Sequence, residues 1–246
     1  MARVYIHEFV DVVGTARAKY QHHMTANWCP EAGPLRRQSC FGVFSVVGST
    51  GRWPQVVNLW EYEGWDGLAH NFEVELVGDH HRDPMLAEWW AQAAEFRTGG
   101  LDRVLVAHPD SPSVADWEAQ GGTGAVAYVH ETVACRPGTA AQVCEALVGP
   151  ATQDRERFGM QLVGAFRTAM RADDEVIGLW SVPDWERWAR FESASDGGDV
   201  EFFHLYERLG DTVTARERIL LVDAALSPLR IGRQPAASDR RPLDEF

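Results

Sequence analysis

The chain has 246 residues, 45% of them hydrophobic, and a formal net charge of -13. This length and apolar content suffice for two ordinary domains with buried cores. The acidic balance disfavours nucleic acid and anionic membranes as partners, because both are bound through clustered Lys and Arg. No stretch has the length and hydrophobicity of a membrane span, so we expect a cytoplasmic protein. With nucleic acid and membranes disfavoured as partners, we expect its partner to be a small molecule.

The first half of the chain predicts the element order β-α-β-β-α-β. Residues 4–12 are rich in β-branched and aromatic side chains and predict a strand. Gly14-Thr15 offers a turn and N-cap for a helix over 16–28, which Pro30 and Gly33-Pro34 should end. The remaining elements are expected as strands over 39–47 and 55–62, a helical region over 65–96 broken near 78 and 83–84, and a strand over 103–107.

A sequence repeat indicates that this order is written twice. Tyr5-Ile6-His7-Glu8 recurs as Tyr128-Val129-His130-Glu131, and Leu59-Trp60 recurs as Leu179-Trp180. The second copy predicts strands over 126–134, 161–170, 175–181 and 218–223, with helices over 139–148 and between 181 and 208. Copies of this size are too long for solenoid units and predict fused globular domains.

These patterns predict an α+β protein made of two fused ferredoxin-like domains, whose antiparallel sheets pack as a single-chain dimeric α+β barrel. We expect the first domain over 1–108 and the second over 125–230. Residues 109–124 read as a linker by their Pro, Ser and Gly content, and residues 231–246 as a flexible tail.

The same features carry a family resemblance. Gln55-Val56-Val57-Asn58-Leu59-Trp60-Glu61-Tyr62, followed by an acidic helix, is similar to NIPSNAP-type domains of the dimeric α+β barrel superfamily. The first strand, its polar residue at position 7 and Gly14-Thr15-Ala16 resemble the antibiotic-biosynthesis and haem-degrading monooxygenases of that superfamily. The resemblance implies a pocket between sheet and helices, lined by His7, the Ala69-His70 neighbourhood, and His80 or His81.

Histidines are concentrated in the first copy, which carries seven of the nine. We therefore expect the active pocket in the first domain, with His7 as general base or ligand and His130 as its structural echo. His70 and Glu8 are the other catalytic candidates. A carboxylate on a covered strand face needs a partner or a raised pKa, although an ion pair at a strand edge or interface is the simpler interpretation. His22 and His23 are expected near a helix end, exposed to solvent.

Two further sets of residues follow from composition. Neutral imidazole binds transition metals and haem, so a metal could be held by a set drawn from His7, His22, His70, His80 and His81. The cofactor stays open between none, a transition metal and haem. Aromatic residues that could wall a pocket for a flat substrate are Tyr5, Phe9, Trp28, Trp60 and Trp65, and core packing would explain the same residues.

The leading functional hypothesis is a small-molecule enzyme of bacterial secondary or degradative metabolism, acting on an aromatic or apolar substrate by monooxygenase-type chemistry. A lyase, isomerase or cyclase step would use the same pocket and base. A metal- or haem-dependent enzyme is a third hypothesis, and a non-catalytic, NIPSNAP-like ligand-binding protein is a fourth. A homo-oligomer is compatible with each of these.

Overall fold

The structure, a computed structural model, describes residues 2–77, 83–197 and 209–246. The chain forms two compact units. The first comprises Met1–Arg103, Ser113–Thr123 and Asp223–Phe246, and the second comprises Val104–Pro112 and Gly124–Val222.

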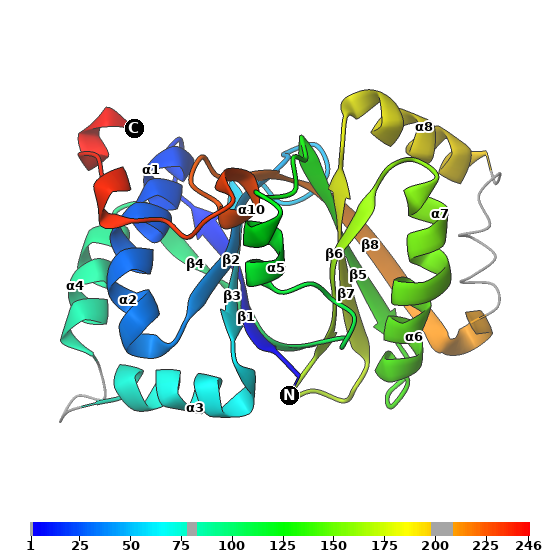
Figure 1. The fold of residues 1–246 in the computed structure, drawn as a ribbon, viewed down its shortest axis with the longest axis horizontal. Helices are drawn as coiled ribbons and strands as arrows, with labels where there is room; N and C mark the ends of the chain where they lie inside the picture. Colours follow the sequence, from blue (N-terminus) through cyan, green and yellow to red (C-terminus); the bar gives the residue numbers. More distant parts are fainter. Residues whose placement is uncertain (1, 78–82, 198–208) are drawn as a thin grey trace. The chain divides into compact units, whose positions relative to one another are not determined.

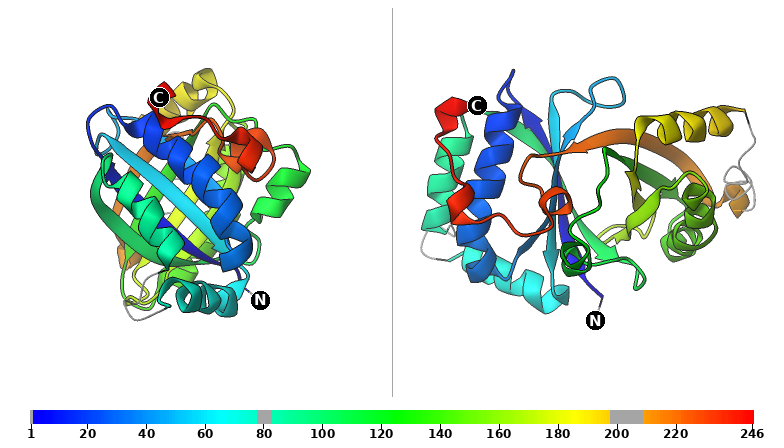
Figure 2. Two further views of the ribbon diagram at one scale, coloured as in Figure 1. Left: turned by 90° about the vertical axis from the view of Figure 1, so that its left-hand side faces the viewer. Right: turned by 45° about the horizontal axis from the view of Figure 1, so that its top comes forward.

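The first unit begins with the predicted β-α-β-β-α-β order. Its elements in chain order are β1 (Val4–Val12), α1 (Arg17–His22), the π-helical turn η1 (His23–Trp28), α2 (Cys29–Arg36), β2 (Ser39–Val46), β3 (Gln55–Tyr62), α3 (Gly64–Glu75), α4 (Pro84–Ala93) and β4 (Arg97–Ala107). The strand order β1-β3-β2 is antiparallel at both pairings. Helices α1, α2 and α4 lie on one side of these strands (Figure 1), and α2 and α4 cross them side by side (Figure 2).

The second unit repeats the order in its own elements. These are β5 (Ala127–Cys135), α6 (Ala140–Ala146), the π-helical turn η2 (Leu147–Ala151), α7 (Thr152–Glu156), β6 (Gln161–Thr168), β7 (Glu175–Val182), α8 (Trp185–Asp196) and β8 (Val213–Asp223). The strand order is β8-β5-β7-β6, and the end of β4 pairs antiparallel with β6.

The pleat of β1 decides which side chains face the helices. Glu8 lies opposite Asn58 of β3, while His7 lies opposite Leu59, so the two neighbours point to opposite faces of the sheet. Strands β2 and β3 are buried almost throughout, with Val43, Phe44 and Val57 completely so. Each such apolar side chain contributes about 1.5–3 kcal/mol through removal from water.

The first helical segment differs from its predicted range. It does not stop at residue 28 but continues through η1 and α2 to Arg36, which has a left-handed C-cap at Arg37. Pro30 cannot donate to the carbonyl of Ala26 because it has no N–H. The Arg240 Nε donates to that carbonyl instead, at 3.2 Å, and so compensates the helix for its proline.

The two segments expected to be irregular also carry structure. Residues 113–123 contain α5 (Val114–Ala119), which begins with a capping box of Ser113 and Asp116. After α10 (Pro228–Ile231), the C-terminal residues lie along α1 and α2 rather than forming the flexible tail expected from composition (Figure 1). Their contacts include the Arg240–Glu31 ion pair and a hydrogen bond from the Arg241 amide to His22 Nε2 at 3.0 Å. Within the described residues, no helix has the length and hydrophobicity needed to cross a membrane.

Candidate functional site

Glu8 is the centre of a polar cluster on the helix-covered face of β1. Its Oε2 accepts hydrogen bonds from Trp60 Nε1 at 2.7 Å and from Asn58 Nδ2 at 2.9 Å. Burial raises the pKa of Glu8, and the negative charge of Asp102 on β4 raises it further. The two hydrogen bonds and Arg97 oppose this rise. Residue Glu8 as a whole is nevertheless half-buried, so a raised pKa of its carboxyl goes with a side chain that keeps some accessible surface.

Asn58 links this carboxyl to α1. Its amide nitrogen also donates to the hydroxyl of Tyr20, at 3.1 Å, and both residues are fully buried. The Oδ1 of Asn58 is buried and has no hydrogen-bond partner among the described residues. An unsatisfied buried acceptor is uncommon in native proteins. It is therefore an unsatisfied acceptor beside Glu8.

A second hydrogen-bonded chain continues the same face toward α2. Trp28 Nε1 donates to Gln38 Oε1 at 3.2 Å, and Gln38 Nε2 donates to the hydroxyl of Tyr62 at 2.7 Å. Burial raises the pKa of Tyr62, and the nearby charge of Glu8 adds to that rise. Arg36 stacks over Trp28, with its guanidinium carbon 5.1 Å from the ring centroid. Of the predicted aromatic wall, Trp28 and Trp60 therefore lie on the Glu8 side.

The second copy holds the equivalent carboxylate in a different state. Glu131 is fully buried and pairs with Arg155 of α7 at 2.7 Å, with Arg216 of β8 at 3.6 Å from its other oxygen. Arg155 also stacks on Trp180, 3.7 Å from the ring centroid. For Glu8, by contrast, no basic side chain of residues 2–77, 83–197 or 209–246 lies within ion-pair distance. A covered carboxylate needs a charged partner or has a raised pKa. Glu131 has the charged partner, and Glu8 has the raised pKa.

One substitution in the third strand accounts for part of this divergence. The residue opposite Glu8 is Asn58, whereas the residue opposite Glu131 is Gly178. A Cβ at Gly178 would lie 2.1 Å from the Trp180 ring, so the indole lies directly over this glycine. The Nε1 of Trp180 is buried without a hydrogen-bond partner among the described residues. Asn58 occupies the corresponding space in the first copy, and Trp60 places its Nε1 on Glu8 instead.

His7 does not line the helix-covered face, contrary to what the resemblance implied. It is fully buried on the opposite face of β1, where its ring makes an edge contact with Phe9 at 4.9 Å. Tyr5 shares that face and donates to Glu61 Oε2 at 2.5 Å. The reason is the two-residue period of a strand, which sends His7 and Glu8 to opposite sides. Glu8 is therefore the candidate residue of β1 that faces the helices. Tyr5 and Phe9 lie with His7 on the opposite face.

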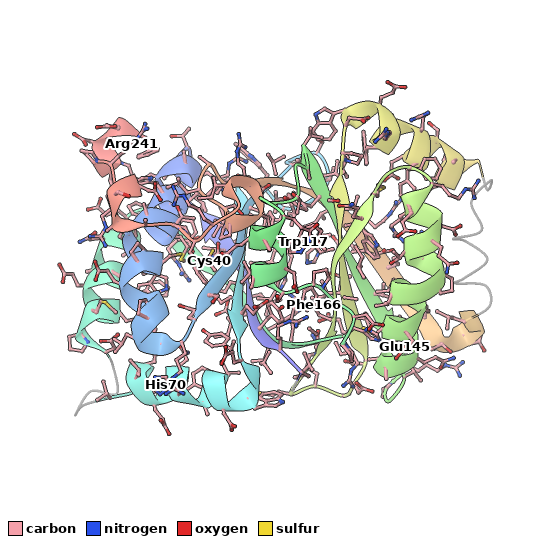
Figure 3. The ribbon with its side chains drawn as sticks, viewed as in Figure 1. Cys40, His70, Trp117, Glu145, Phe166 and Arg241 are labelled. Atoms are coloured by element: carbon pink, nitrogen blue, oxygen red, sulfur yellow. The ribbon has the colours of Figure 1, made fainter. Side chains whose placement is uncertain are left out.

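The other predicted site residues are dispersed. His70 lies on α3 (Figure 3), where its Nε2 hydrogen-bonds the carbonyl of Leu35 at 3.1 Å and its Nδ1 is 4.0 Å from Glu73. Trp65, in the first turn of α3, is 49% exposed and does not wall a buried site. His70 is thus tied to α2 and to its own helix rather than to Glu8.

His22 and His23 are buried inside the continuous helical segment, so their predicted exposure near a helix end is wrong. His22 accepts the Arg241 amide and stacks on Phe246 at 4.3 Å, while the His23 ring lies flat on Trp89 at 4.7 Å. Burial lowers the pKa of both imidazoles. Each is consequently neutral near pH 7 and engaged in packing.

The described part of the chain contains no group of three or more His, Cys, Asp or Glu side chains arranged to hold a metal ion. His7, His22 and His70 have separate surroundings, on the far face of β1, beneath the C-terminal segment and on α3. His80 and His81 lie outside the described residues.

Several members of the cluster were not predicted. Asn58 carried a signal, because it is a polar residue within the apolar run Val56-Val57-Asn58-Leu59-Trp60 and faces the same way as Glu8. Tyr20 and Gln38 carried none, since a polar residue in a helix or at a strand start is ordinarily solvated.

Comparison with solved structures finds proteins of similar fold. An anthrone oxidase-like protein matches 96% of this chain and 96% of its own, at 11% identity and a TM-score of 0.62. A candidate monooxygenase from Lactobacillus acidophilus NCFM matches 96% of this chain and 97% of its own, at 8% identity and a TM-score of 0.58. A NIPSNAP family protein of unknown function from Agrobacterium tumefaciens matches 42% of this chain and 92% of its own, at 18% identity and a TM-score of 0.33.

The fold assignment rests on the two matches that span both chains. The chain shares with them the dimeric α+β barrel fold that its element order and internal repeat predict. No protein-family model and no curated protein matches the sequence.

Proposed function

We propose that the chain consists of two fused ferredoxin-like domains, of which the first is a small-molecule enzyme and Glu8 is its proton-transfer group. The observation that carries the proposal is the contrast between equivalent carboxylates. Glu8 is half-buried, has a raised pKa and is hydrogen-bonded by neutral donors, whereas Glu131 is sealed and neutralised by Arg155. A raised carboxyl pKa near a reacting group is how proteins prepare a base or acid for work near neutral pH.

The surroundings of Glu8 favour a flat substrate with a weakly acidic proton. Trp60 and Trp28 supply aromatic surface, and the Oδ1 of Asn58 supplies an acceptor for a hydroxyl. Glu8 as carboxylate would take a proton from a phenol, an enol or an activated carbon. The substrate anion would then be stabilised by delocalisation over its rings and by neutral donors rather than by a cation.

Oxygenation is the reaction that we favour after this step, because the full-length structural neighbours carry the names of oxidising enzymes. An activated CH₂ group and dioxygen would give a carbonyl group and water. The four electrons that reduce dioxygen all come from the CH₂ carbon, so this balance needs no added reductant. The natural substrate would be an aromatic metabolite of bacterial secondary or degradative metabolism.

Turnover of anthrone in the presence of dioxygen is the first test, since this compound has the required activated CH₂ group. We expect Glu8→Gln to lose turnover and the matched control Glu131→Gln to keep its activity per folded molecule. The rate should rise with pH as Glu8 ionises, with a midpoint above the usual carboxyl range. Full activity of folded Glu8→Gln would refute the assignment. Conversion without oxygen consumption would replace oxygenation by an isomerase, lyase or cyclase step from the same base.

A further inference from the structure

One difference between the two copies lies in the helical segment after strand one, at the position that supplies the arginine partner of Glu131. A constant offset of 123 residues relates Val4 to Ala127 at the start of β1 and β5, and Cys29 to Thr152 at the start of α2 and α7. The same offset relates Glu8 to Glu131 and Ala32 to Arg155. Ala32 and Arg155 are both fully buried, each as the fourth residue of its helix.

Arg155 fills the space in front of the second carboxylate. Its Nη2 donates to Glu131, its Nη1 donates to the carbonyl of Ala151 at 3.3 Å, and its guanidinium lies on the face of Trp180. Such a planar cation, paired and stacked at once, is held rigidly and excludes other occupants. Glu131 accordingly retains no accessible surface.

Ala32 can do none of this, because its side chain ends at Cβ. Glu8 keeps an accessible surface where Glu131 keeps none, and its shortest hydrogen bond comes from Trp60 rather than from an arginine. In the second copy, the Trp180 indole lies over Gly178 and Arg155 stacks on that indole. In the first copy, Asn58 stands in place of this glycine. The residues at these two positions therefore accompany the difference in burial between Glu8 and Glu131.

We propose that position 32 is the gate of the site around Glu8: alanine leaves the carboxyl open to a neutral aromatic ligand with an acidic proton, and arginine at the equivalent position 155 holds the second copy closed. This inference rests on the proposed function for the role of the ligand, but the open and closed states of the two carboxyls are independent of any turnover. The specificity of the site would then be set by a residue that itself carries no reactive group.

The test introduces the arginine and glycine of the second copy at the equivalent positions of the first copy, in the whole 246-residue chain. In Ala32→Arg/Asn58→Gly, the carboxyl of Glu8 is followed by carbon-detected NMR across pH, with Glu8→Gln to assign the signal and Ala32→Ser as a small-residue control. We expect the pKa of Glu8 to fall below its wild-type value in the double variant, because a guanidinium now stabilises the carboxylate. The Ala32→Ser control should leave it unchanged. An unchanged titration of Glu8 in the folded double variant would overturn the proposal.

Binding of 1-naphthol, a neutral aromatic phenol, provides a second readout by calorimetry. We expect the double variant to bind it about tenfold or more weakly than wild type. The reciprocal variant Arg155→Ala/Gly178→Asn should gain a second site, and it keeps the proposal testable if the first variant fails to fold. Equal 1-naphthol affinity in wild type and the folded Ala32→Arg/Asn58→Gly chain would contradict the gate. Failure of the proposed function would give a different result: Glu8→Gln would be active, while Ala32→Arg/Asn58→Gly would still change the titration of Glu8 and weaken 1-naphthol binding.

Discussion

Replacing glutamate by glutamine should destabilise the protein at position 131 but not at the equivalent position 8. Arg155 and Glu131 are completely buried and 2.7 Å apart. Glu131→Gln leaves the guanidinium without its counter-charge, and breaking such a pair from one side costs about 3–5 kcal/mol. At about 2–4 °C per kcal/mol for a chain of this length, the melting temperature should fall by roughly 6–20 °C.

Glu8→Gln should instead leave the protein equally or more stable at neutral pH. Burial and Asp102 raise the pKa of Glu8, so the folded state is penalised when that carboxyl ionises. Each unit of upward shift corresponds to about 1.4 kcal/mol. The contribution of Glu8 to stability is fully present below the unfolded pKa of about 4.3 and is lost as the pH rises through the higher folded pKa. The advantage of glutamine should therefore appear above the folded pKa and vanish in acid.

Urea unfolding of wild type and both variants, repeated between acid and neutral pH, measures these differences. Circular dichroism and tryptophan fluorescence together report whether the transitions coincide. If Glu8→Gln lost as much stability as Glu131→Gln at neutral pH, Glu8 would be a structural ion-pair residue. The reasoning that assigns it a proton-transfer role would then be refuted.

Three further variants test the surroundings of Glu8, the role of His7 and the packing of the C-terminal segment. Trp60→Phe removes the indole donor to Glu8, so the pKa of Glu8 should rise and the acid limb of the pH–rate profile should move to higher pH; an unmoved limb would show that this bond does not tune the base. His7→Gln should retain turnover per folded molecule, because His7 faces away from Glu8, and loss of activity at an intact fold would move the site to the His7 face. Deleting residues 233–246 uncovers His22 and leaves the Ala26 carbonyl without Arg240, so hydrogen–deuterium exchange should accelerate in α1 and η1, and unchanged protection there would contradict the packing described.

The order of strands and helices was predictable because it depends on local pattern. Strands β1 and β3 occupy the predicted ranges, since alternation and β-branched content mark them clearly. The end of the first helical segment was not predictable from Pro30. A proline disfavours a helix in part because it leaves a carbonyl without its donor, and here Arg240, more than two hundred residues away in the sequence, supplies that donor.

The sequence named both His7 and Glu8 as candidates on the first strand, but it did not predict which of them faces the helices. Concentration of histidines in the first copy drew the prediction to His7, whereas the pleat places its neighbour Glu8 against the helices. The requirement that Glu8 and Glu131 need either a partner or a raised pKa did follow from the sequence. The choice between the two states could not, because it depends on Arg155, whose reach to Glu131 becomes evident only once α7 is packed on the sheet.

Deuterium exchange into anthrone without oxygen tests the role of Glu8 most directly. In deuterated buffer under anaerobic conditions, proton abstraction from the CH₂ group is read by mass spectrometry, whatever reaction follows it. We expect wild type and Glu131→Gln to accelerate exchange over buffer, and Glu8→Gln to exchange at the buffer rate. Acceleration by folded Glu8→Gln equal to that of wild type would contradict the assignment of Glu8 as the base.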